Sequence, residues 1–306
     1  MKRVALTAAL VLAGAGVATA QSSGLYTSGY VQHDYLNPSG SSSDANFSSA
    51  DFVVGYGFGG AGSLPMGVEL GVLAFAIDSG GPAQTKHALF PTFWVDTSVG
   101  RFSVGAPRSA VGSAIRIPRI GGTAYLPLMI SISLAQTDYV PLMGGNIHSY
   151  GVRYDGSVGG FDAGLSLHGF TGSASDAHSL TGVIGRDYGA FSFAVGFDAL
   201  QTPSYSEQTY LAQLGYDAGR YGGHLTLAAN SDSNDLLTVA DVFYKPIDWL
   251  TLNASYLNSS GSDDLYGLNA EVSFLKNGYA GVGYIDGFGG GSDYLTTVYA
   301  GWKLNY

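Results

Sequence analysis

The chain contains no cysteine and few charged residues, and both shortages narrow the classes of protein to which it can belong. Without cysteine it cannot be a small scaffold stapled by disulfides. Only 13 lysines and arginines oppose 23 acidic residues, and the formal net charge of −10 argues against nucleic acid as a partner. Long apolar runs are also scarce. The longest uncharged candidate beyond the N-terminus, 120–137, contains Gly121, Gly122 and Pro127, so a membrane-spanning helix is not expected there.

The N-terminus has the three parts of a secretory signal peptide. Lys2 and Arg3 precede an apolar segment over 4–17, and Ala18-Thr-Ala20 provides small residues for cleavage before Gln21. We therefore expect residues 1–20 to be removed, which takes the formal net charge from −10 to −12 because two cations leave with them. The alternative is an uncleaved anchor helix, for which the segment is short and lacks a distal charged stop.

The C-terminal segment 294–306 alternates with a period of two. Its even positions are mostly apolar and aromatic, ending with Trp302, Leu304 and Tyr306, whereas most odd positions are polar or small. This pattern predicts a strand with lipid on one face and water on the other, as in the closing strand of an outer-membrane β-barrel. A chain that crosses a membrane without helices has to close into a barrel, because every backbone polar group needs a partner within the bilayer.

The same alternation predicts sixteen antiparallel strands and one up-and-down barrel over residues 21–306. The predicted strands lie at 24–36, 46–58, 66–78, 87–100, 101–107, 147–155, 161–170, 177–187, 190–200, 207–217, 221–231, 236–245, 249–259, 264–274, 279–288 and 293–306. Short Gly- or Pro-bearing turns such as Lys245 to Asp248 alternate with longer polar links such as Ser79 to Lys86. Turns at one end and loops at the other are typical of outer-membrane barrels.

The two faces of these strands differ in charge. One face is apolar and uncharged, for example Phe191, Phe193, Val195 and Phe197. The opposite faces hold ionisable residues: Asp51, Arg101, Asp162, His168, Asp198, His224, Glu271 and Lys303. A lysine or arginine on the lipid face costs about 2–4 kcal/mol at the bilayer midplane, so the pattern indicates a wet interior. The alternative, a soluble β-sandwich, would bury the apolar faces against each other.

The longest link, 108–146, follows the fifth strand and is expected to be an outer loop that folds into the barrel and narrows it. It carries Arg108, Arg116, Arg119 and Asp138, and Arg101 and Arg153 flank it. A positive field at a constriction would favour anions. We expect these residues to form the constriction together with Glu69. The alternative is structural pairing of the arginines with carboxylates such as Glu69 or Asp138.

The segment 128–134 (Leu-Met-Ile-Ser-Ile-Ser-Leu) also alternates, and as a strand with a companion in 109–117 it would raise the count to eighteen. Met129, Ile130, Ile132 and Leu134 could instead pack an apolar plug in the barrel. Sixteen strands and eighteen both remain open from the sequence.

Four short segments resemble the general porins of Gram-negative outer membranes, most closely those of alphaproteobacteria. Ser149-Tyr-Gly-Val-Arg-Tyr-Asp155 followed by Gly159-Gly-Phe-Asp-Ala-Gly-Leu165 resembles the strand–turn–strand after their constriction loop. Gly100-Arg-Phe-Ser-Val-Gly105 and Tyr299 to Tyr306 are similar as well. The resemblance implies a sixteen-stranded homotrimer that passes small hydrophilic solutes, with the third outer loop folded inside. The family's inward loop usually carries several carboxylates, whereas here only Asp138 is acidic.

Catalysis is not expected. Ser166, His168 and Asp162 share an inward face, but a lipid-cleaving site would have to lie on the outer face, and there is no Gly-x-Ser-x-Gly elbow. The six histidines have no paired spacing, so we expect no metal site and no cofactor. Weak divalent-cation binding by outer loops remains open, because Asp232, Asp235, Asp263 and Asp264 lie there.

The sequence therefore predicts a porin of a Gram-negative outer membrane, homotrimeric and in contact with lipopolysaccharide and lipid, through which small polar solutes pass by diffusion with a bias for anions. Two alternatives stay open. One is a substrate-selective channel for an anionic or sugar-like solute. The other is a non-conducting structural or recognition barrel.

Overall fold

The computed structural model describes residues 24–40, 43–59, 64–134, 136–143, 147–172, 177–204, 206–231, 236–259, 264–288 and 293–305. The predicted signal peptide, 1–20, lies outside the described residues, as do Asp232, Asp235 and Asp263 of the predicted acidic loops.

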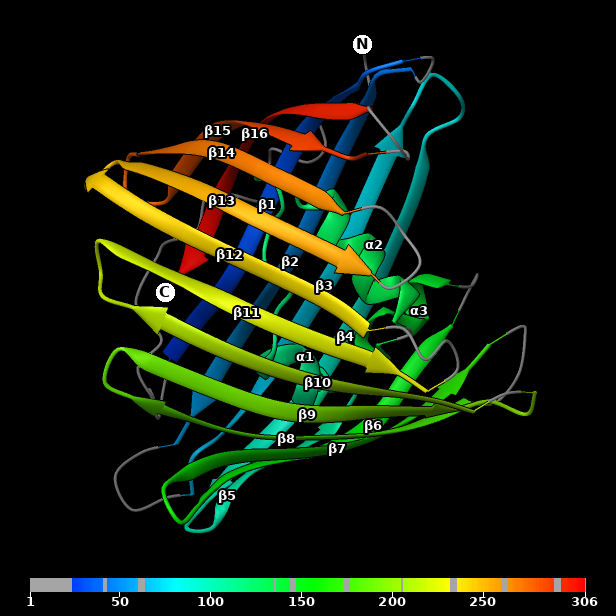
Figure 1. Ribbon diagram of the computed structural model, residues 1–306. Coiled ribbons are helices and arrows are strands. Elements are labelled where there is room, and N and C mark those ends of the chain that lie inside the picture. Colours follow the sequence, from blue (N-terminus) through cyan, green and yellow to red (C-terminus); the bar gives the residue numbers. More distant parts are fainter. Residues whose placement is uncertain are drawn as a thin grey trace.

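The described chain forms one closed barrel of sixteen antiparallel strands, each paired with its neighbours in sequence (Figure 1). The strands are β1 (Gly24–Pro38), β2 (Ala45–Phe58), β3 (Met66–Asp78), β4 (Gln84–Thr97), β5 (Gly100–Gly105), β6 (His148–Val158), β7 (Phe161–Thr171), β8 (Ala177–Tyr188), β9 (Phe191–Gln201), β10 (Ser206–Asp217), β11 (Tyr221–Asn230), β12 (Leu236–Ile247), β13 (Leu250–Ser259), β14 (Leu265–Phe274), β15 (Gly278–Asp286) and β16 (Tyr294–Asn305). The predicted fold class and sixteen strands are confirmed.

The barrel closes between its first and last strands. In the register of β1 with β16, Ser28 pairs with Asn305 and Val31 pairs with Trp302. Both described chain ends therefore lie at one end of the barrel. Two-residue turns such as 98–99 and 189–190 lie at this same end, which we call the short-turn end. The opposite end carries longer links such as 39–44 and 287–293, and we call it the long-loop end.

The predicted difference between the two strand faces is also present. Outward side chains are apolar and exposed, as at Leu165, Val195 and Leu268. The ionisable residues predicted to face inward do so: Arg101, His168 and Asp198, for example, contact groups inside the barrel. Among the described residues, no helix is long and apolar enough to cross a membrane.

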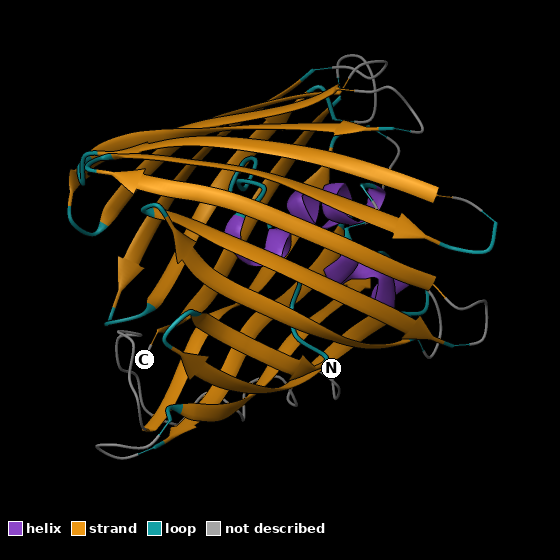
Figure 2. Cartoon of the chain, turned by 90° about the horizontal axis from the view of Figure 1, so that it is seen from below, coloured by secondary structure: helices purple, strands orange, loops and turns teal. Residues whose placement is uncertain are grey.

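The link 106–147, here called the inner loop, contains all the helices of the described chain. They are α1 (Ala110–Ala114), α2 (Tyr125–Ser133), the 3-10 helix Thr137–Tyr139 and α3 (Val140–Met143). Figure 2 shows them inside the ring of strands. The alternative of a strand over 128–134 is wrong, because 128–133 belong to α2 and Leu134 is its C-cap. A strand inside a closed barrel would find no free edge to pair with, whereas a helix satisfies its own backbone groups.

Candidate channel constriction

Polar side chains of the wall hold the backbone of the inner loop at several points. At one of them Asp34, on β1, accepts hydrogen bonds from the Thr123 hydroxyl at 2.8 Å and the Ala124 amide at 3.0 Å. On β16, Thr297 donates to the Gly121 carbonyl at 2.8 Å. Asp34 and Thr297 are fully buried. The loop is therefore docked against the seam where the barrel closes.

Gly121 and Gly122 allow this docking. Their φ angles are +57° and +77°, in the left-handed region that favours glycine. A Cβ at Gly121 would lie 2.4 Å from Ile285, and one at Gly122 would lie 2.2 Å from the ring of Tyr299. The loop backbone thus approaches the wall too closely for any side chain.

The inner loop is also held on the opposite wall. The amide of Ala110, at the start of α1, donates to the Ser166 hydroxyl at 3.1 Å and to the Thr181 hydroxyl at 3.2 Å. His168 Nε2 lies 2.9 Å from the Ser166 Oγ, and both residues are almost fully buried beneath the loop. Asp162 does not join them and accepts a hydrogen bond from Ser157 instead. This arrangement gives Ser166 and His168 a structural role as an anchor for α1.

Arg108 and Asp138 are joined within the loop. The Nε of Arg108 lies 3.0 Å from Asp138, its NH1 group lies 2.9 Å from Asp51 on β2, and its guanidinium lies over the ring of Phe90. Asp138 is 1% exposed and also accepts the Ser109 amide. Burial opposes the charge of Arg108, but the two carboxylates outweigh it and raise the pKa of the guanidinium well above its ordinary value. Neither charge is free to act on a passing solute.

Arg153, on β6, is likewise occupied. It forms an ion pair of 2.5 Å with Asp155 and donates to the carbonyls of Arg108 and Ser109 at 3.2 Å. It thus braces the start of the inner loop.

Arg101 and Glu69 meet near the short-turn end, 3.7 Å apart. Arg101 also pairs with Asp96 at 2.6 Å and stacks on Trp94, whose indole donates to the Tyr26 hydroxyl. Tyr26 in turn donates to Glu69. Two cavities inside the barrel have Arg116 in their linings, and neither Arg101 nor Glu69 lines them.

Arg119 lies against the aromatic wall of the lumen. Its guanidinium is 4.7 Å from the ring centre of Tyr30 and 5.2 Å from that of Tyr279, and it donates to the Tyr279 hydroxyl at 3.1 Å. Glu271 lies 3.9 Å from Arg119 and 3.5 Å from Lys303, so one carboxylate serves two cations.

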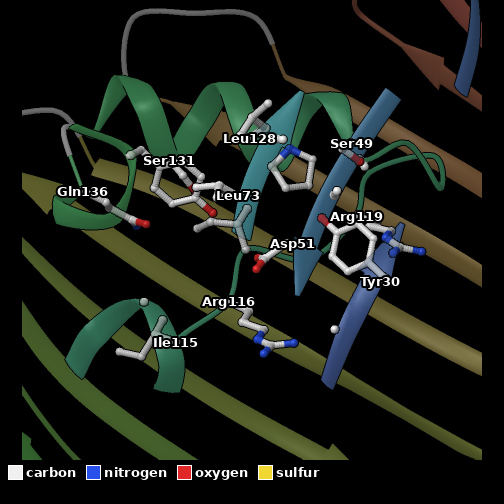
Figure 3. A pocket seen from close by; sticks show the side chains of 18 of the residues that line it. Tyr30, Ser49, Asp51, Leu73, Ile115, Arg116, Arg119, Leu128, Ser131 and Gln136 are labelled. Atoms are coloured by element: carbon white, nitrogen blue, oxygen red, sulfur yellow. The ribbon is translucent and has the colours of Figure 1, made fainter. Parts of the chain in front are cut away.

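Arg116 differs from the other arginines. Its side chain is exposed inside the barrel and makes no ion pair with any residue in the described part of the chain. Its backbone carbonyl accepts a hydrogen bond of 2.8 Å from Gln213 on β10, which fixes the position from which the side chain projects. Figure 3 shows Arg116 and Arg119 reaching the same open space.

Two neighbouring cavities share Arg116, Ile117, Arg119 and Lys303 in their linings. The first has a volume of about 340 Å³ and lies between the inner loop and β1–β3. The second, of about 520 Å³, lies between the loop and β10–β14. Its ionisable lining is Arg116, Arg119, Lys245, Lys303, His224, Asp217, Asp241 and Glu271. Four permanent cations therefore face three carboxylates. Lys245 and Asp241 were absent from the predicted constriction, although both occupy inward positions of the alternation in β12.

Towards the long-loop end the barrel interior is apolar. We call this region the apolar plug. It consists of inward wall residues and α2 residues in one hydrophobic cluster: Leu36, Phe47, Leu73, Val239, Leu257, Ile285, Leu295, Leu126, Leu128 and Leu134, with Met129, Ile130 and Ile132 packed against them. Phe47, Val239 and Ile285 are 0% exposed. Within α2, Leu126, Leu128 and Ser131 are buried, whereas Ser133 is exposed.

The chain was compared with known protein families, sequences and solved structures. No family model matches the chain, and no curated protein matches its sequence. Solved structures do. A variant with three substitutions of the porin of Rhodopseudomonas blastica aligns at TM-score 0.66 and 15% identity, covering 92% of this chain and 100% of the other. A variant with two substitutions aligns at TM-score 0.64 and 14% identity over the same shares. The chain has the porin fold. At this identity the likeness concerns the fold alone.

Proposed function

We propose that this protein is a porin of a Gram-negative outer membrane that passes small hydrophilic solutes by diffusion. The closed barrel, its apolar outer belt and its polar interior towards the short-turn end support this function. The short-turn end would face the periplasm and the long-loop end the outside, in contact with lipopolysaccharide. A homotrimer is part of the proposal and follows the general preference for closed symmetry.

The proposed channel favours anions. The observation that carries this is the exposed side chain of Arg116, which has no ion pair among the described residues and lies at the junction of the two cavities. Its charge is not neutralised locally, so it raises the concentration of anions around it. The paired arginines Arg101, Arg108 and Arg153 are proposed to shape the lumen rather than select the solute.

The apolar plug favours a second candidate function, a barrel that does not conduct. Its fully buried residues Phe47, Val239 and Ile285 place apolar surface around α2. In this alternative the protein is a structural or recognition element of the outer membrane, and the two cavities open towards the short-turn end only.

Planar-bilayer recording separates the two. Purified full-length protein would be added to a membrane under a tenfold KCl gradient, and the single-channel steps and the reversal potential would be read. Steps in groups of three with a reversal potential of anion sign are the expected result. A reversal potential of cation sign would contradict the role of Arg116. The absence of conductance steps in independent preparations of correctly folded barrels would favour the barrel that does not conduct.

A further inference from the structure

The cavity of about 340 Å³ beside α2 has a lining that suits a particular kind of solute. Its volume falls at the lower end of small-molecule sites, about 300–1,000 Å³. Much of its wall is apolar, formed by Leu73, Ile115, Ile117, Pro127 and Leu128 together with the rings of Tyr30 and Tyr139. An inorganic anion or a sugar would leave this apolar surface uncovered.

The charged side of the cavity is formed by Arg116, Arg119 and Lys303, and by Asp51, whose carboxylate is paired with Arg108. Arg119 is held by Tyr279 and Glu271, whereas Arg116 keeps its donors free of any described carboxylate. A guanidinium in this state matches a carboxylate, which it can bind through two parallel hydrogen bonds. The apolar wall and the free guanidinium together select an amphiphilic anion.

Two residues that line the cavity carry a polar side-chain atom with no hydrogen-bond partner among the described residues. Gln136 is 4% exposed, and its Nε2 makes no hydrogen bond within the described residues. The buried Oγ of Ser49 also makes none there. Both residues line this cavity, and Figure 3 shows Gln136 and Arg119 on opposite sides of it, with Arg116 below. Buried donors are nearly always satisfied in folded proteins, so the unpaired amide of a residue that lines the cavity requires an acceptor.

We propose that this cavity binds a small amphiphilic carboxylate, with its anion at Arg116, its ring or chain against Leu73 and Leu128, and a second oxygen that accepts a hydrogen bond from Gln136. The inference depends on the proposed channel function only for how the solute reaches the lumen. Binding itself can be measured without current.

The test is calorimetric titration of the full-length protein in detergent micelles with 4-hydroxybenzoate. Three comparison compounds lack one or two of these features: 4-hydroxybenzyl alcohol lacks the anion, benzoate lacks the far oxygen, and acetate lacks both the ring and the far oxygen. We expect saturable binding of 4-hydroxybenzoate that is about tenfold tighter than that of each comparison compound. Equal affinity for 4-hydroxybenzoate and 4-hydroxybenzyl alcohol, or no saturable heat at all, would overturn the proposal and leave ordered water as the partner of Gln136.

Variants assign the contacts. Arg116→Gln should weaken 4-hydroxybenzoate about tenfold and leave 4-hydroxybenzyl alcohol unchanged. Gln136→Leu, which is close in size but has no donor, should reduce the affinity for 4-hydroxybenzoate to that for benzoate and leave benzoate unchanged. Arg220→Gln, at an exposed turn, is the charge control. Equal losses for all ligands in either variant would contradict the assigned contacts.

The two proposals fail separately. Conductance without binding of 4-hydroxybenzoate would support the proposed channel and contradict the proposed binding site. Binding without conductance would leave the site and remove the channel.

Discussion

The carboxylate of Asp198 accepts two hydrogen bonds from Thr137, one from the backbone amide at 2.8 Å and one from the hydroxyl at 2.7 Å. Asp198 projects inward from β9, and Thr137 belongs to the inner loop, so the pair joins the loop to the wall. The two residues are 3% and 1% exposed. Loss of either donor leaves a buried carboxylate short of a partner, which is more costly than the bond itself is favourable.

Thr137→Val therefore lowers the free energy of unfolding by about 1.5–3 kcal/mol, because it removes the hydroxyl donor and keeps the shape. Equilibrium unfolding in urea, followed by tryptophan fluorescence in micelles, measures this loss. Thr238→Val, on the outer face of β12, is the control. A loss of the same size in both variants would show that Thr137 has no special role.

Gly121→Ala is expected to displace the inner loop. The new Cβ would lie 2.4 Å from Ile285 at a φ of +57°, and backbone strain and overpacking each cost about 1–3 kcal/mol. Gly189→Ala is a matched control, because Gly189 has a φ of +63° and no atom within 4 Å of the added Cβ. Unfolding free energies should fall in both variants, but further in Gly121→Ala. Equal losses of unfolding free energy in the two variants would mean that Ile285 and the neighbouring wall shift to make room for the new Cβ.

Arg116→Gln should reduce the ratio of chloride to potassium permeability. One unit charge about 4 Å from an ion in water contributes about 1 kcal/mol, which corresponds to about a fivefold change. The reversal potential under a KCl gradient gives the ratio directly. Arg108→Gln is not a suitable comparison, because its loss leaves Asp51 and Asp138 unpaired. Arg220→Gln is a suitable control. An equal shift of the reversal potential in that variant would contradict a selective role of Arg116.

Leu134→Ser places a hydroxyl in the apolar plug and is expected to increase single-channel conductance, because water then enters the layer around α2. Leu134 is 8% exposed and belongs to the buried cluster. Met143→Ser is the control, because Met143 is 40% exposed on α3. Unchanged conductance in Leu134→Ser, with the barrel still folded, would place the conducting path away from the plug.

The strands could be predicted from the sequence because their pattern is local. A period of two with lipid on one side leaves a uniform signal, and the predicted ranges 66–78 and 236–245 correspond to Met66–Asp78 and Leu236–Ile247. The turns at each end then fix the parity that places the inner loop at the long-loop end. No long-range information is needed for either step.

The interior of the loop could not be predicted in this way. Alternation over 128–134 fits a strand as well as a short helix, and only the absence of a free edge inside the barrel decides between them. The partners of Arg108 and Arg119 come from strands far away in sequence, so spacing contained no sign of which arginine would remain unpaired. The buried hydroxyls of Ser166, Thr181 and Thr297 did alternate inward. The local sequence pattern does not reveal that these hydroxyls contact the inner loop.

The docking of Gly121 and Thr123 at the seam between β1 and β16 has a consequence for folding. Asp34, near one end of the chain, and Thr297, near the other, both hold the middle of the chain. Contacts between such distant positions form late in folding, because the entropy cost of closing a long loop must be met before the contact stabilises the chain. We therefore expect β16 to pair with β1 only when the inner loop already lies inside the barrel. This closure should be a slow step, and a chain shortened before β16 could not complete it.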